Sequence, residues 1–154
     1  MSRVLLIGEP MVLYIAETEG PLEDVEKFTR ALAGAEINVS IGLNRLGHNV
    51  SYVTKLGNDP FGRYISKFLS HENIDTGYIM YDDKFPTGFM LKSKVSKGDP
   101  EIAYFRKGSA ASNITIGDID NLDLTNFDLI HITGIFPALS MTTREATYYL
   151  IYNK

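Results

Sequence analysis

A continuous apolar run near the start of the chain predicts a strand that is covered on both faces. Residues 4–7 read Val-Leu-Leu-Ile, and a glycine ends the run. A strand with one wet face would alternate polar and apolar residues, and this one does not. Residues 11–16 are again apolar and extended up to a Gly-Pro break at 20–21. Residues 25–32 alternate weakly and predict another strand.

The pattern then alternates between helix and strand. Residues 36–46 carry apolar side chains at helical spacing, and residues 50–56 form a second apolar run. A further helix is expected after Asp59, a good N-cap residue, with Pro60 at the first helical position and an end near Glu72. Strands that alternate with helices in this way predict a parallel sheet with right-handed crossovers.

Shorter strands with tight turns are expected next, at residues 78–81, 88–95 and 101–105. Turn-forming residues separate them, which is typical of an antiparallel arrangement. They predict a small antiparallel sheet that is inserted in the α/β core and spans approximately residues 11–32 and 78–106.

The last segments return to the core pattern. Residues 127–133 predict a buried strand, and Thr142 with Glu145 predicts a capping box for a final helix. A crossover helix of this kind normally returns the chain to another parallel strand. We therefore expect residues 1–154 to be the N-terminal part of one larger α/β domain.

Composition narrows the classes of function. The 154 residues are 44% hydrophobic and 22% charged, the balance of an ordinary globular domain. The net charge of -4 argues against a broad nucleic-acid surface, and the absence of cysteine excludes thiol chemistry. No segment resembles a signal peptide or a membrane span, so we expect a cytoplasmic protein without a membrane partner. The three histidines show no metal-ligand spacing.

Residues 33–40 are the strongest candidate for a binding site. They read Ala-Gly-Ala-Glu-Ile-Asn-Val-Ser and place small residues and Asn38 where a helix begins. Helix starts present unpaired N–H groups and a partial positive charge. A polyhydroxylated or anionic ligand can lie against such an end, and Gly34 leaves room for it. A plain helix start is the alternative reading of the same residues.

The longer pattern resembles the first signature of the ribokinase-like (PfkB) family of carbohydrate kinases. The positions that carry this resemblance are Gly34, Asn38, Gly47, Gly57, Asp59 and Gly62. The resemblance implies a three-layer domain with a parallel central sheet and a small antiparallel β lid over a sugar site. It also implies ATP-dependent phosphorylation of a sugar hydroxyl, with Mg²⁺ bridging the phosphates.

Within this family the chain is most similar to the 2-keto-3-deoxygluconate kinases. The similarity rests on residues 8–10, 104–110 and 133–140. It also rests on Leu13, which stands where ribokinases and fructokinases usually carry an Asp that holds sugar hydroxyls. A Leu cannot accept a hydrogen bond.

The resemblance implies roles for particular side chains. Asn38 would hydrogen-bond a hydroxyl, while Tyr104 and Arg106 would face the acid end of the substrate. The planar guanidinium of Arg suits a carboxylate because it can make two parallel hydrogen bonds. Met90 stands where relatives often carry Tyr and cannot donate a hydrogen bond. The implied substrate-binding set is Gly34, Ala35, Asn38, Met90, Tyr104 and Arg106.

The second signature of the family, which supplies the catalytic Asp and an anion hole of glycine amides, is not found in this sequence. The resemblance therefore implies that the base and most of the ATP site lie outside these residues, and that this chain alone is inactive. Two alternatives stay open. One is a fructokinase or another sugar kinase of the family, and the other is a non-catalytic sugar-binding module. In either case we expect a homo-oligomer through the lid strands and no nucleic-acid partner.

Overall fold

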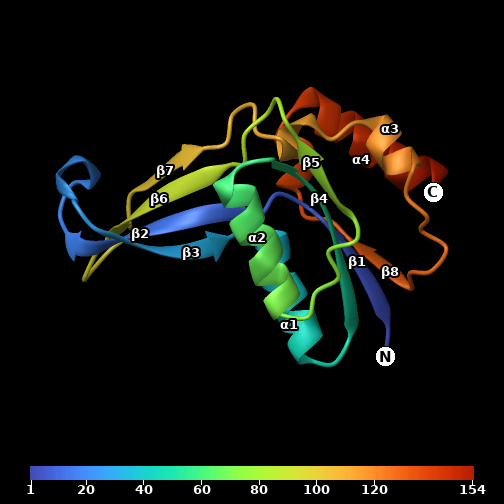
Figure 1. Ribbon diagram of the computed structural model, residues 1–154, viewed down its shortest axis with the longest axis horizontal. Helices are drawn as coiled ribbons and strands as arrows, with labels where there is room; N and C mark the ends of the chain where they lie inside the picture. The colour runs from blue at the N-terminus through green and yellow to red at the C-terminus, as the bar shows by residue number, and fades with distance from the viewer.

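The computed structural model describes residues 1–154 and divides into two sheets (Figure 1). The first sheet has the strand order β5-β4-β1-β8, and every neighbouring pair is parallel. Its strands are β1 (Arg3–Ile7), β4 (Asn49–Gly57), β5 (Ile79–Asp82) and β8 (Leu129–His131). The predicted α/β class with a parallel central sheet is confirmed.

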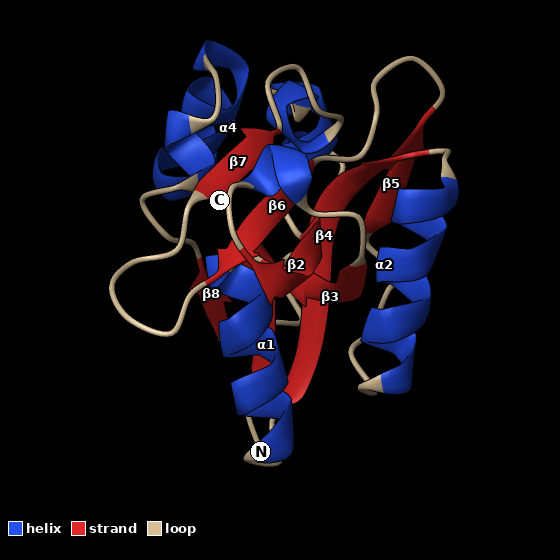
Figure 2. Cartoon of the chain, turned by 90° about the vertical axis from the view of Figure 1, so that its left-hand side faces the viewer, coloured by secondary structure: helices blue, strands red, loops and turns tan.

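Helices cover both faces of this core sheet (Figure 1, Figure 2). On one face lie α1 (Ala35–Arg45) and α2 (Pro60–His71), and on the other lie α3 (Ile116–Asp120) and α4 (Met141–Asn153). Short 3-10 turns are η1 (Leu22–Asp24), η2 (Ala111–Asn113) and η3 (Phe136–Ala138). No helix combines the length and the apolar character that crossing a membrane requires.

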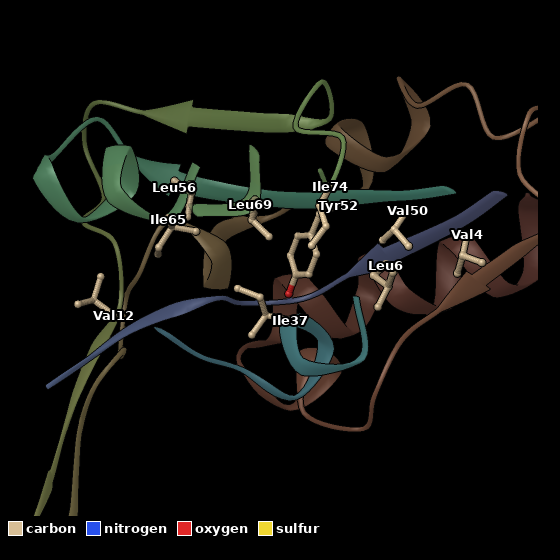
Figure 3. Close-up of a cluster of buried hydrophobic side chains, with 10 residues drawn as sticks. All are labelled: Val4, Leu6, Val12, Ile37, Val50, Tyr52, Leu56, Ile65, Leu69 and Ile74. Atoms are coloured by element: carbon tan, nitrogen blue, oxygen red, sulfur yellow. The ribbon is translucent and has the colours of Figure 1, made fainter. Parts of the chain in front are cut away.

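Strand β1 shows why the first run is wholly apolar. Val4 and Leu6 belong to a cluster of ten buried residues on the side of α1 and α2. Leu5 and Ile7 belong to a cluster of eight on the side of α3 and α4. Figure 3 shows the first cluster, in which the ring of Tyr52 lies among aliphatic side chains. Burying one such side chain contributes about 1.5–3 kcal/mol. Because its side chains pack alternately into both clusters, β1 joins the two helical layers.

The second sheet, which we call the lid, extends away from the core (Figure 1). Its order is β3-β2-β6-β7, formed by β2 (Met11–Glu19), β3 (Phe28–Ala33), β6 (Phe89–Lys94) and β7 (Ile102–Phe105). The outer pairs are antiparallel, but β2 pairs with β6 in parallel. The lid is therefore a mixed sheet, which corrects the expectation of a wholly antiparallel one. Strands β2 and β6 run in the same direction because each enters the lid from the carboxyl end of a core strand.

One strand of the expected insert belongs to the core. Strand β5 pairs in parallel with residues 54–57 of β4, at the edge of the core sheet. A strand that follows a helix returns in parallel to its neighbour through a right-handed crossover, and α2 provides that crossover here. The segment 78–106 therefore contributes only β6 and β7 to the lid.

The strand expected at 127–133 is shorter and more exposed than its apolar sequence predicts. Strand β8 has three residues, and Leu129 is 53% exposed. The cause is its position, because β8 pairs only with β1 and forms the edge of the sheet. An apolar run does not show whether its strand has a second neighbour.

The helix caps agree with the sequence in one case and differ in the other. Asp59 caps α2, and its Oδ1 accepts the backbone N–H three residues later at 2.8 Å. Helix α4 is capped by Ser140 and Thr143, whose side chains accept each other's backbone N–H at 3.1 Å. The expected Thr142–Glu145 box is wrong because Ser140, two residues earlier, is an equally good cap.

Candidate functional site

A cavity of about 180 Å³ lies where three connections between core and lid meet. Glu9 comes from the β1–β2 connection, Gly34 from the β3–α1 connection and Arg106 from the end of β7. In parallel α/β sheets, ligands bind beyond the carboxyl ends of the strands, which is the position of this cavity. A larger cavity of about 420 Å³ lies at the opposite ends, near Arg3 and Asn49, where β1 and β4 begin. The smaller cavity is therefore the better candidate site.

All six residues that the resemblance places at the substrate site line this cavity. They come from the start of α1 and from the consecutive strands β6 and β7, which are far from α1 in sequence, so the fold brings the two groups together. The complete lining is Glu9, Met11, Ala33, Gly34, Ala35, Glu36, Asn38, Met90, Tyr104, Arg106 and Ile135.

Gly34 makes the sharp passage from lid to core possible. Its φ of 148° and ψ of 134° lie in a region that is essentially restricted to glycine. A Cβ atom there would also lie 3.0 Å from the carbonyl oxygen of Glu9. No side chain caps the first turn of α1, and Ala35 from that turn lines the cavity. The helix start therefore offers N–H donors to a ligand.

Glu9 is buried and has two partners from the end of the lid. Its Oε2 accepts a hydrogen bond from Arg106 Nε at 2.7 Å and lies 2.5 Å from Arg106 Nη2. Its Oε1 accepts a hydrogen bond from the hydroxyl of Ser109. Burial raises the pKa of Glu9, although the charge of Arg106 and the hydrogen bonds from Ser109 and Arg106 act in the opposite direction. This ion pair joins the β1–β2 connection to the segment after β7.

Glu36 is a second buried carboxylate, on the floor of the same cavity. The hydroxyl of Thr133 donates to its Oε1 at 2.5 Å, which ties α1 to the segment after β8. Gly8 makes room for it, since a Cβ at that position would overlap the Glu36 carboxyl group. Burial, with the charges of Glu36 and Glu9, raises the pKa of Tyr52 well above its usual value. The site therefore combines an acidic floor with one arginine at the rim.

The lid contributes an apolar surface and one aromatic ring. Met11, Leu13 and Met90 form a small buried cluster, and Met11 and Met90 line the cavity. Met90 lies opposite Tyr104 in the β6–β7 pairing. Tyr104 is 54% exposed, and its ring centroid lies 5.8 Å from the guanidinium carbon of Arg106, within the range of a cation–π contact. A ligand there meets sulfur and carbon on one side and polar groups on the other.

A wider cavity of about 530 Å³ adjoins the first. Tyr104, Arg106 and Ile135 line both, so the two are parts of one cleft between lid and core. The wider part adds Lys107 and apolar residues of the segment 134–139. Its rim is cationic, which suits an anionic group of a ligand.

The implied substrate-binding set leaves out the polar groups that support the site. Glu9, Glu36, Ser109 and Thr133 lie in segments that the sequence had singled out, but none was assigned a role, although each makes a contact at or beside the cavity. The sequence does contain a signal for Glu9, which is a lone carboxylate between two apolar runs. A carboxylate buried in such a place needs a partner, because burying an unpaired charge is costly. Glu36, in contrast, looks like an ordinary acidic residue in the first turn of a helix.

No group of three or more His, Asp or Glu side chains is placed to hold a metal ion in residues 1–154. The polar groups at the cavity are instead N–H groups, one amide, one phenol, one guanidinium and two carboxylates that already have partners. Such a set fits a polar organic ligand better than a divalent cation.

Comparison with known proteins gives a consistent picture. The sequence profile of the pfkB family carbohydrate kinases matches residues 1–151. The chain is 41% identical over 145 residues to the 2-dehydro-3-deoxygluconokinase of Bacillus subtilis, covering 94% of this chain and 45% of that protein. It is 33% identical over 150 residues to the 2-dehydro-3-deoxygluconokinase of Thermoproteus tenax, covering 96% and 46%. Fructokinase-1 of Zea mays is also similar, with 28% identity over 134 residues, covering 86% and 40%.

Solved structures agree with this result. A PfkB protein from Polaromonas sp. JS666 superposes with a TM-score of 0.90 at 42% identity, covering 96% of this chain and 50% of that one. The uncharacterized sugar kinase PH1459 from Pyrococcus horikoshii, in complex with ATP, gives 0.85 at 32% identity, covering 96% and 48%. The chain spans about half the length of the relatives that it matches.

Proposed function

Because this chain belongs to the pfkB family of carbohydrate kinases, we propose that it forms the sugar-binding half of an ATP-dependent kinase for 2-keto-3-deoxygluconate. The observation that carries the proposal is the convergence of Gly34, Asn38, Tyr104 and Arg106 on one cavity at the lid–core junction. The similarity to two 2-dehydro-3-deoxygluconokinases supports the choice of substrate.

The polar side of the cavity fits the two ends of a sugar acid. Asn38 and the free N–H groups at the start of α1 bind hydroxyl oxygens. Arg106 binds the carboxylate, and Tyr104 covers it from the lid. The cationic rim then fixes which end of the substrate points toward the lid.

The apolar side of the cavity fits a deoxy carbon. Met11 and Met90 face the ligand space with groups that neither donate nor accept strong hydrogen bonds. A methylene group loses nothing against them, whereas a buried hydroxyl without a partner costs about 1–3 kcal/mol. This favours a 3-deoxy sugar acid over fructose, the substrate of the main alternative.

The reaction itself transfers the terminal phosphoryl group of ATP to a hydroxyl of the sugar acid. In this proposal ATP and Mg²⁺ bind largely to parts of the kinase beyond these residues, since the chain offers no donor set for a metal ion. The contribution of the chain is to bind the sugar acid, to orient it and to exclude water from it beneath the lid.

Ligand-observed NMR with the 154-residue chain, combined with ADP release by the full-length protein that contains it, tests this function. We expect the chain to bind 2-keto-3-deoxygluconate at least about tenfold more tightly than fructose, a difference of about 1.4 kcal/mol. We expect ADP release only from the full-length protein. Tighter binding of fructose, with fructose-dependent ADP release, would instead establish the fructokinase alternative.

A further inference from the structure

We propose that Glu9 is a positioning residue, which holds one edge of the Arg106 guanidinium so that the opposite edge is presented to the substrate carboxylate. This inference rests on the proposed function and assigns a role to Glu9, for which the resemblance implied none. It is carried by the geometry of a single ion pair at the junction of core and lid.

The contacts of Arg106 divide its guanidinium into an occupied edge and a free one. Nε donates to Glu9 Oε2 at 2.7 Å, and Nη2 lies 2.5 Å from the same oxygen. No other protein group accepts a hydrogen bond from this guanidinium, so Nη1 keeps both of its N–H donors. Because the group is planar, fixing the Nε/Nη2 edge also fixes the direction of the remaining donors.

The pair is asymmetric in a way that suits this role. The Glu9 side chain is 1% exposed and the Arg106 side chain is 23% exposed, so the carboxylate is the fixed anchor and the guanidinium reaches the cavity. A buried carboxylate is costly without its partner, which keeps Arg106 in place when no ligand is bound. Substrate binding then does not have to select one rotamer of a long, flexible side chain.

The surroundings of Glu9 hold its carboxylate in a defined place. The hydroxyl of Ser109 donates to Oε1, the oxygen that Arg106 does not use. Gly88 leaves space for that oxygen, because a Cβ there would lie 2.7 Å from it. The segment that carries Ser109 also returns a backbone hydrogen bond to the Arg106 carbonyl at 3.1 Å. Glu9 is therefore oriented from two sides.

The pairing also changes what kind of anion Arg106 attracts. Glu9 and Arg106 cancel each other's formal charge, and Glu36 adds a negative charge to the same cavity. The arginine therefore contributes directed donors more than a general positive potential. A planar carboxylate that approaches Nη1 and Nη2 accepts two directed hydrogen bonds, whereas a diffusely bound anion does not.

The test measures binding of 2-keto-3-deoxygluconate and of fructose, which lacks the carboxylate, to the chain and to Glu9→Gln. We expect Glu9→Gln to weaken binding of the keto acid about tenfold and to change fructose binding less than about twofold. Glu23→Gln makes the same chemical change on an exposed side chain without hydrogen bonds and should change neither. A merely structural role of Glu9 would weaken both ligands together.

A second variant keeps the test decisive if Glu9→Gln does not fold. Ser109→Ala removes the hydrogen bond to Oε1 and leaves the ion pair intact, so it should weaken keto-acid binding about twofold to threefold with fructose unchanged. If the wild-type chain prefers the keto acid and a folded Glu9→Gln keeps that preference, the positioning role is wrong and the proposed function stands. If Glu9→Gln does not fold, unchanged keto-acid binding by Ser109→Ala overturns the positioning role in the same way. If the wild-type chain shows no preference for the keto acid, both proposals are wrong, since Arg106 then does not bind the carboxylate of the keto acid.

Discussion

The core sheet and the lid are both four-stranded, but they bury their apolar residues to different extents. The two core clusters hold ten and eight buried residues, of which only Val12 belongs to the lid, and Leu5, Leu6 and Ile7 of β1 have no exposed surface. The lid contributes a cluster of three, and Tyr104 and Phe105 at its end are half exposed. Since burial of apolar surface is the main source of stability, the core is the stable part of the molecule.

The lid is held to the core by polar contacts as well as apolar ones, since Val12 of β2 belongs to the ten-residue cluster and the rings of Tyr14 and Phe89 contact Phe61 of α2. Glu9 binds the segment after β7, and Asp59, the cap of α2, also accepts a hydrogen bond from the backbone N–H of Thr87, just before β6. Elements that must rearrange around ligands are usually drawn from the less stable parts of a protein. The difference between the sheets therefore separates a scaffold from a ligand-facing surface, and the variants below test that separation.

The largest effect is expected from a cavity in the core. Leu6→Ala should destabilise the chain by about 2–5 kcal/mol, because Leu6 is completely buried between the core sheet and the layer of α1 and α2. Leu13→Ala makes the same change in the lid, where Leu13 is 9% exposed in a cluster of three, and should cost no more than about 2 kcal/mol. Urea unfolding followed by circular dichroism measures both. Equal losses would show that lid and core are equally well packed.

A backbone change at the junction should come next. Gly34→Ala should cost about 1–3 kcal/mol, since φ of 148° is strained for any side chain and the added Cβ meets the Glu9 carbonyl. Gly42→Ala is the matched control, because Gly42 lies inside α1 with open space around it and should gain about 0.5–1 kcal/mol. The two variants should shift the urea midpoint in opposite directions. If Gly34→Ala leaves the urea midpoint unchanged, the backbone conformation does not require a glycine at this position.

A smaller, pH-dependent effect is expected at Asp59. Burial opposes its ionisation, but the backbone N–H groups of Thr87 and Gly62 outweigh burial and lower its pKa below 3.8. A carboxyl group whose pKa is lower in the folded state stabilises the fold above pH 3.8, and this stabilisation disappears as the pH falls through the folded-state value. Asp59→Asn should therefore cost about 1 kcal/mol at pH 7 and less at pH 3, where part of the stabilisation is lost.

The measurement for Asp59 is the urea midpoint of the wild type and of Asp59→Asn at pH 7, 5 and 3. Asp24→Asn is the control, because Asp24 is exposed and its side chain makes no hydrogen bond. A gap between wild type and Asp59→Asn that stays constant over this range would show that the charge of Asp59 does not contribute.

The same contrast explains how much the sequence could predict. A continuous apolar run indicates burial on both faces, and an Asp before a helix indicates a cap. Both signals are local in sequence, so the strand at 4–7 and the cap at Asp59 were predicted correctly. The parallel pairing of β2 with β6 and the exposure of β8 depend on which strands become neighbours, and local patterns do not contain that information. The resemblance to a family did place six residues that line one cavity. A resemblance can, however, assign roles only to positions whose roles are already known in that family. Glu9 acts through contacts with residues about a hundred positions away, so the fold was needed to show its partners.

The smallest effect on stability is expected at the edge of the lid, where the sequence predicts self-association. Strand β7 has one free edge, and Ile102 on it is partly exposed. A lysine on an edge strand blocks pairing with another strand, so Ile102→Lys should shift the mass in light scattering toward the 17.2 kDa of one chain. Its free energy of unfolding, extrapolated to low protein concentration, should change by less than about 0.5 kcal/mol. Val95→Lys adds the same charge beyond the end of β6 and should leave the mass unchanged. A wild-type chain that is already monomeric at micromolar concentration would contradict association through the lid, and the lid would then be a surface for ligand alone.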